Sequence, residues 1–110
     1  RIVCAVGGAA LPAILGRLRT NHALDPTLAD PEANLRALWF DTIVQDAPTL
    51  RFIAETVGVG RLMMGSDHPF PIGDRAPRRI IAAAGFDAAT QAAIEGETAQ
   101  RVFGLAGTKG

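Results

Sequence analysis

Three short apolar segments, separated by stretches with helical spacing, most constrain what this chain can fold into. They cover residues 1–6, 38–44 and 61–66 and are typical of buried β-strands. Each is followed by apolar residues spaced as on one face of an amphipathic helix. Because strands that alternate with helices build parallel sheets through right-handed crossovers, we predict an α/β fold with a parallel sheet.

Residues that begin and end helices support this alternation. We predict helices over residues 10–20, 31–37, 47–57, 76–84 and 88–103, with loops over 21–31 and 67–75. Asp46 and Asp87 precede two of these helices, and aspartate is a favourable N-cap residue. Gly58 and Gly104 follow the same two helices, where glycine commonly ends a helix. The boundaries of these two helices are therefore the best defined by sequence.

The length of the chain limits how much of a known architecture it can supply. Its 110 residues suit one domain. A closed (β/α)8 barrel needs about 250 residues, so this chain could supply three of its eight strand–helix units. The first strand begins at residue 1 without an initiator methionine. We therefore expect a segment of a longer fold.

Charge and hydropathy argue against several classes of protein. Eleven Lys and Arg residues balance eleven Asp and Glu residues, so no basic excess indicates a nucleic-acid partner. No run of 18 apolar residues indicates a membrane partner, and the cytoplasm is the expected location. Cys4 is the only cysteine, so no disulfide can form within the chain. Its position in a buried strand favours an inert core residue over a nucleophile.

The stretch GSDHPFP, residues 65–71, is the strongest candidate for a functional site. Asp67 follows the third predicted strand, and ligands bind at the carboxyl ends of parallel strands. Its carboxylate could bind a metal or accept a proton, or it could only cap a turn. Neighbouring side chains point in opposite directions on an extended chain. His68 could thus line the site, but a joint metal pair with Asp67 is not expected.

Four other residues have a structural and a functional interpretation. Gly7 and Gly8 end the first strand and form either a simple turn or a close approach to a ligand. Asp41 lies within the second predicted strand, where a buried carboxylate needs hydrogen-bond partners, so a structural role is favoured. Arg17 is polar on an otherwise apolar helix. It is either a solvated surface residue or a clamp for a substrate.

Four stretches together resemble the C-terminal region of the amidohydrolase-related family, in the branch of the aminocarboxymuconate-semialdehyde decarboxylases. They are CAVGGAALPAILGRL, FDTIVQD, LMMGSDHPFPIGD and TAQRVFGL. They occur in the order and spacing of that family and extend over about residues 1–105. The resemblance implies a partial amidohydrolase-like barrel over 1–105, comprising strands six to eight of a (β/α)8 fold. We expect residues 106–110 to form a flexible tail.

The resemblance also implies an activity and a set of functional residues. Family members use a divalent metal, usually zinc, in non-oxidative decarboxylation or hydrolysis of a small carboxylate substrate. Asp67 matches the metal-binding and catalytic aspartate of the family. Arg17 matches an arginine that reaches a substrate carboxylate across a dimer interface. The implied partners are the substrate and either further copies of the chain or the remainder of the barrel.

The departures from the family pattern concern the catalytic residues. The family has a catalytic histidine where this chain has Val6, and often a histidine where it has Gln45. The strands that carry the other metal-binding histidines have no counterpart here. Asp67 alone cannot hold a catalytic zinc, which takes three protein ligands.

Two hypotheses about function follow. The chain is either the C-terminal segment of a metal-dependent enzyme, inactive on its own, or a non-catalytic partial barrel. The second could be a binding or assembly module or a degenerate remnant. Either would expose the edges of its sheet, so we expect it to associate with other chains.

Overall fold

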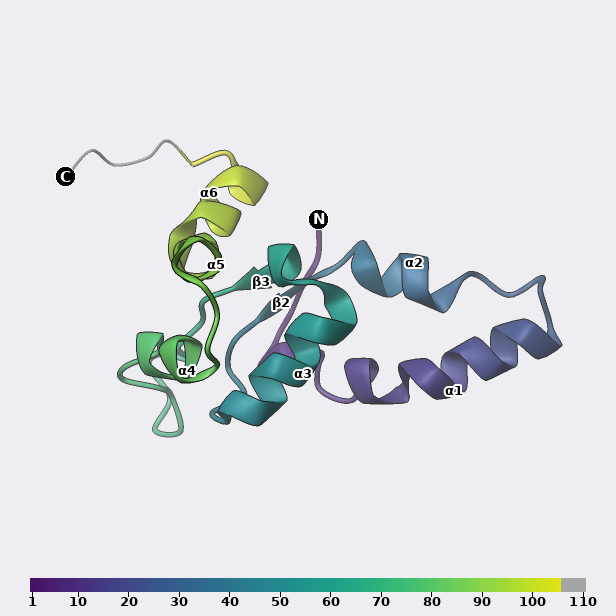
Figure 1. Ribbon diagram of the computed structural model, residues 1–110, viewed down its shortest axis with the longest axis horizontal. Helices are drawn as coiled ribbons and strands as arrows, with labels where there is room; N and C mark the ends of the chain where they lie inside the picture. Colours follow the sequence, from purple (N-terminus) through teal and green to yellow (C-terminus); the bar gives the residue numbers. More distant parts are fainter. Residues whose placement is uncertain (106–110) are drawn as a thin grey trace.

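The computed structural model describes residues 1–105, and the predicted tail at 106–110 lies outside the described residues (Figure 1). Three strands, β1 (Val3–Cys4), β2 (Trp39–Asp41) and β3 (Leu62–Met63), form a parallel sheet in the order β1-β2-β3. Phe40 in the central strand pairs with Cys4 on one side and with Leu62 on the other. The predicted parallel sheet is confirmed, although each strand is shorter than its apolar segment.

Helices follow each strand, as the sequence predicts. The α-helices are α1 (Leu11–Leu24), α2 (Pro31–Arg36), α3 (Ala47–Val57), α4 (Arg78–Ala83), α5 (Ala88–Ala92) and α6 (Thr98–Phe103). Short turns of 3-10 helix lie at η1 (Val6–Gly8) and η2 (Val59–Arg61), and a π turn, η3 (Ala93–Glu97), joins α5 to α6. The predicted helix over 88–103 is therefore continuous but widens in its middle.

The end of α1 corrects one boundary. The helix continues to Leu24, so the first residues of the predicted loop 21–31 are helical. Nothing between residues 20 and 24 breaks a helix. Asp25 leaves the helical conformation, as expected for a residue that precedes a proline. The Asp25 N–H then donates to the Asn21 carbonyl and closes the last turn.

The core lies between the sheet and the helices that cover it. Phe40 of β2 and Leu62 of β3 are fully buried. They belong to one cluster with residues of the covering helices, among them Leu15, Leu50, Ile53, Ile81 and Ile94. Full burial of such a side chain contributes roughly 1.5–3 kcal/mol. The cluster therefore fixes the sheet against α1, α3 and α4.

The other parts of the sheet are less covered. In β1, Val3 is 39% exposed, and the preceding Ile2 is 61% exposed. Within residues 1–105, β1 and β3 each have a hydrogen-bonded neighbour on one side only. Helices α1 and α2 pack together and extend away from the sheet (Figure 1), which makes the molecule elongated, 52 × 29 × 28 Å.

Candidate functional site at the carboxyl ends of the strands

A buried carboxylate joins the ends of two neighbouring strands. Asp41, the last residue of β2, accepts hydrogen bonds from the backbone N–H groups of Val6 and Gly7 at 3.0 and 2.8 Å. It also accepts one from the Ile43 N–H at 3.0 Å. Asp41 is only 9% exposed, so these three donors compensate for its loss of water. The predicted structural role of Asp41 is confirmed.

Glycines let the strand ends approach one another closely. Gly7 has φ +60, and a Cβ atom there would lie 2.5 Å from the Val44 side chain. A Cβ atom at Gly65 would lie 2.9 Å from the Ile43 side chain. The Gly65 N–H donates to the Thr42 hydroxyl at 3.3 Å. The Gly7–Gly8 segment is therefore a tight turn packed against the molecule's own side chains.

Asp67 follows β3 with its carboxylate unused by the surrounding turn. The residue is half-buried and has φ +58. Its backbone carbonyl, and not its side chain, accepts the hydrogen bond from the Phe70 N–H at 3.0 Å. No hydrogen bond to the carboxylate is present within residues 1–105. The alternative that Asp67 serves to cap a turn is therefore not what the structure shows.

His68 lies beside Asp67 on the exposed side of the same loop. Its backbone N–H donates to the Ser66 hydroxyl at 3.3 Å, and the His68–Pro69 peptide bond is cis. The residue lines a cavity of about 720 Å³ formed by the loop 66–77, together with Arg75. Asp67 is not among the residues that line this cavity. The two neighbouring side chains therefore do not share a cavity in the part of the chain that the structure describes.

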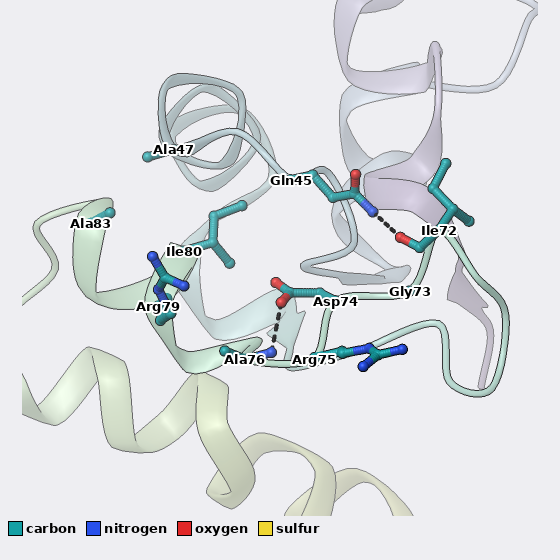
Figure 2. Close-up of a pocket in the computed structure, with 10 residues that line it drawn as sticks. All are labelled: Gln45, Ala47, Ile72, Gly73, Asp74, Arg75, Ala76, Arg79, Ile80 and Ala83. Carbon is teal, nitrogen blue, oxygen red and sulfur yellow. Dashed lines mark hydrogen bonds between the residues drawn. The ribbon is translucent and has the colours of Figure 1, made fainter.

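A second cavity, of about 660 Å³, lies between the loop after β2 and the loop after β3 (Figure 2). The Gln45 side-chain amide donates to the Ile72 carbonyl and connects the two loops. The Asp74 carboxylate accepts from the Ala76 N–H at 2.8 Å and points into the cavity (Figure 2). Arg79 borders the cavity from α4. Gln45 thus holds the two loops together.

Sequence reasoning missed Asp74 and Arg79. Both belong to the stretch GDRAPRR, a group of charges that directly follows the strand-end loop. That concentration of charge at the carboxyl edge of a parallel sheet is the signal that could have identified them.

Arg17 and Val6 are placed differently from Asp67. Arg17 is exposed in the middle of α1, a helix that extends away from the loops beside α4 (Figure 1). Arg17 and Asp67 of the same chain therefore do not lie in one site. Val6 is 54% exposed and has φ +53, an unfavourable conformation for a β-branched residue.

The Cys4 thiol has the character expected of an inert residue. Partial burial raises the pKa of Cys4, and the negative charge of Asp41 raises this pKa further. A thiol with a raised pKa is protonated at neutral pH and is a poor nucleophile.

The described residues contain neither a group of three possible metal ligands nor a helix suited to span a membrane. Within 1–105, no three His, Cys, Asp or Glu side chains are grouped so that they could hold a metal ion. In the same range, no helix combines the length and apolar character needed to cross a membrane.

Comparisons with known proteins agree on one kind of relative. The chain is 28% identical over 87 residues to 2-amino-3-carboxymuconate-6-semialdehyde decarboxylase from Dictyostelium discoideum, and 30% identical over 87 residues to the decarboxylase of the same name from Caenorhabditis elegans. Each match covers 74% of this chain but only 24% and 22% of the relatives. The chain thus spans about a quarter of the length of the curated relatives that it matches.

Solved structures show the same fold. The apo form of Metarhizium anisopliae IDCase matches with a TM-score of 0.77 at 25% identity, and 5-carboxyvanillate decarboxylase LigW from Sphingomonas paucimobilis matches with 0.78 at 24% identity. Each match covers 96% of this chain and 34% of the solved chain. The three parallel strands and their helices therefore correspond to about a third of a TIM-barrel chain.

A family model described as Amidohydrolase matches residues 6–105. This range contains β2, β3 and all six α-helices. The sequence relatives and the fold agree with this match, and the chain belongs to the Amidohydrolase family.

Proposed function

We propose that these residues form the last third of a metal-dependent decarboxylase barrel and supply one ligand, Asp67, to its metal site. One observation carries the proposal. The Asp67 carboxylate lies in the loop after β3 without a hydrogen-bond partner in residues 1–105, while the carboxylate of Asp41, the last residue of β2, accepts three backbone hydrogen bonds. A carboxylate without a protein partner beyond this edge of the sheet suits a cation.

The Asp67 carboxylate could serve as one ligand of a divalent metal, but one ligand is not a complete site. A carboxylate oxygen is an accepted zinc ligand, but a catalytic zinc site takes three protein ligands. The other ligands would come from additional strands that close the barrel. The metal would supply Lewis-acid stabilisation of negative charge on the substrate or on water.

The reaction class follows from the relatives. Three of those named above are decarboxylases by name. In a non-oxidative decarboxylation, the bond between carbon and the carboxylate breaks, CO₂ leaves, and a proton takes its place. We propose that the substrate is a small carboxylate, with hydrolysis as the alternative reaction. Arg17 would hold a substrate carboxylate in the site of a neighbouring copy, because within one chain its helix extends away from Asp67.

Proton transfer needs a residue other than Val6. The valine side chain can neither donate nor accept a proton. His68 is the one imidazole beside Asp67 in the chain, and it lines the loop cavity. We propose His68 for substrate binding in the loop cavity that it lines. The residue that carries the proton would come, like the other metal ligands, from the remaining strands of the barrel.

Activity of the longest polypeptide that carries these residues would test the proposal. We expect metal-dependent CO₂ release from a small aromatic or unsaturated carboxylate, and no release by the 110-residue chain alone. Asp67→Asn should abolish the activity, whereas Glu55→Gln, a matched carboxylate-to-amide change on the exposed side of α3, should retain it. Full activity of Asp67→Asn would disprove the proposed role.

A non-catalytic assembly role is the second candidate function. It is favoured by the unpaired outer edges of β1 and β3 within residues 1–105 and by the exposed apolar Ile2. Such edges pair readily with other strands, from further copies or from the remainder of a barrel. Size-exclusion chromatography of the 110-residue chain should show oligomers. A well-folded monomer would contradict this role.

A further inference from the structure

A cavity of about 480 Å³ lies at the amino ends of the strands, away from Asp67. It is bordered by Arg36 at the end of α2, Trp39 at the start of β2, Arg61 just before β3 and Arg101 in α6. The turn over residues 57–60 completes the lining. Three arginines from three separate elements therefore border one hollow.

Trp39 and Arg61 hold one another in place. Because Phe40 pairs with Leu62, the preceding residues Trp39, at the start of β2, and Arg61, just before β3, lie side by side. The Arg61 guanidinium carbon lies 4.8 Å from the centroid of the Trp39 ring, a cation–π contact. Both residues are half-buried. The contact holds the guanidinium beside the ring, and its N–H groups donate no hydrogen bond to the described residues, so they are available to a ligand.

The positive charge in this cavity has little compensation. Arg36 pairs with Glu32 at 3.3 Å, but both side chains are well exposed and such pairs contribute little. Neither Arg61 nor Arg101 forms an ion pair with another residue of the described range. No Asp or Glu of that range lines the cavity. The whole chain carries no formal net charge. The positive charge of this cavity therefore arises because the fold groups these arginines together.

The cavity at the opposite end of the sheet differs in this respect. Arg75 and Arg79 belong to its lining, but the Asp74 carboxylate points into it (Figure 2). A bound anion would meet a negative charge there. The amino-end cavity is therefore the better anion site of the two.

We propose that the amino-end cavity binds a small, multiply charged oxyanion that carries phosphate or carboxylate groups. The planar N–H fork of arginine matches the paired oxygens of both groups. The cavity volume is within the range of small-molecule sites. All of its lining residues belong to this chain, so the site does not depend on the proposed metal chemistry.

Trp39 provides a direct readout, because it is the only tryptophan of the 110 residues. The full chain would be titrated with inorganic phosphate, pyrophosphate or citrate, with sodium chloride holding the ionic strength constant. We expect a saturable change in tryptophan emission. Saturation with pyrophosphate alone would identify a phosphate site, and saturation with citrate alone a carboxylate site. The absence of saturation with all three would overturn the proposal.

Two variants test whether the arginines of this cavity are responsible. Arg101→Gln removes an exposed guanidinium and should weaken the binding of the best anion about tenfold or more. Arg51→Gln, an equal change of charge on α3 outside the cavity, should leave the dissociation constant unchanged. Equal binding by wild type and Arg101→Gln, or equal weakening by both variants, would overturn the proposal.

Discussion

Asp41 and Asp67 follow neighbouring strands of the same sheet, yet their carboxylates have different surroundings. Asp41→Ala would leave three backbone N–H groups without an acceptor near a buried strand end. We predict a loss of about 3 kcal/mol in the free energy of unfolding, measured by urea denaturation. Asp67→Asn, which keeps a residue that tolerates the φ of +58 at this position, should change this free energy by less than about 0.5 kcal/mol. A large loss for Asp67→Asn would mean that its carboxylate is structural.

Val6 is a second residue whose backbone is informative. Its φ of +53 places a β-branched side chain in the left-handed region, which costs about 1–2 kcal/mol. Asparagine tolerates this region better, so we predict that Val6→Asn raises the free energy of unfolding by about 1 kcal/mol. Val59→Asn is the matched control, because Val59 is also exposed but lacks a positive φ. An equal gain in both variants would exclude relief of strain as the cause.

Among the elements, the loop over residues 66–77 depends on one small residue. A Cβ atom at Gly73 would lie 2.9 Å from the backbone oxygens of Ser66, Asp67 and Phe70. We predict that Gly73→Ala lowers the thermal midpoint of unfolding, because those backbone atoms must move apart. Gly16→Ala is the control: its surroundings in α1 are open, so alanine should raise stability by about 0.5–1 kcal/mol. An unchanged midpoint in Gly73→Ala would show that the loop adapts freely.

The start of α3 makes stability depend on pH. Hydrogen bonds from the Thr49 hydroxyl and backbone N–H hold the pKa of Asp46 below its ordinary value of 3.8, and Arg51 lowers this pKa slightly further. The cap therefore contributes its full stability above that ordinary pKa and loses it as the pH falls through the lower folded-state pKa. We predict that wild type loses more stability than Asp46→Asn between pH 6 and pH 2.5. Parallel urea midpoints for the two proteins would contradict this.

The elements also show what could be predicted from sequence. The N-caps Asp46 and Asp87 and the end of α3 at Gly58 are local signals, and each lies where the sequence places it. Strand lengths were overestimated, because pairing depends on neighbouring strands and not on the apolar pattern alone. The extension of α1 was missed because its end depends on Asp25 and the following proline.

Only part of the candidate site could be predicted from the sequence. Asp67 could be identified because its position at a strand end is visible in the sequence. The cavity that contains Asp74 could not, because it forms only when the loops after β2 and β3 meet through Gln45 and Ile72. That contact spans 27 positions in sequence and has no local pattern.

At the scale of the whole molecule, the small size of the sheet limits what the chain can do alone. Its three strands match about a third of the solved decarboxylase chains, and its outer edges are unpaired within residues 1–105. Within residues 1–105, no three His, Cys, Asp or Glu side chains are grouped so that they could hold a metal ion. Under the proposed function, Asp67 would be one ligand and the remaining ligands would come from further strands.

Zinc stoichiometry after equilibrium dialysis tests this central claim most directly. We predict that the 110-residue chain retains no stoichiometric zinc, while a longer polypeptide that also carries the remaining strands retains it. In that polypeptide, Asp67→Asn should lose the metal and Glu55→Gln, on the exposed side of α3, should keep it. Stoichiometric zinc on the 110-residue chain alone, or full retention by Asp67→Asn, would contradict the account.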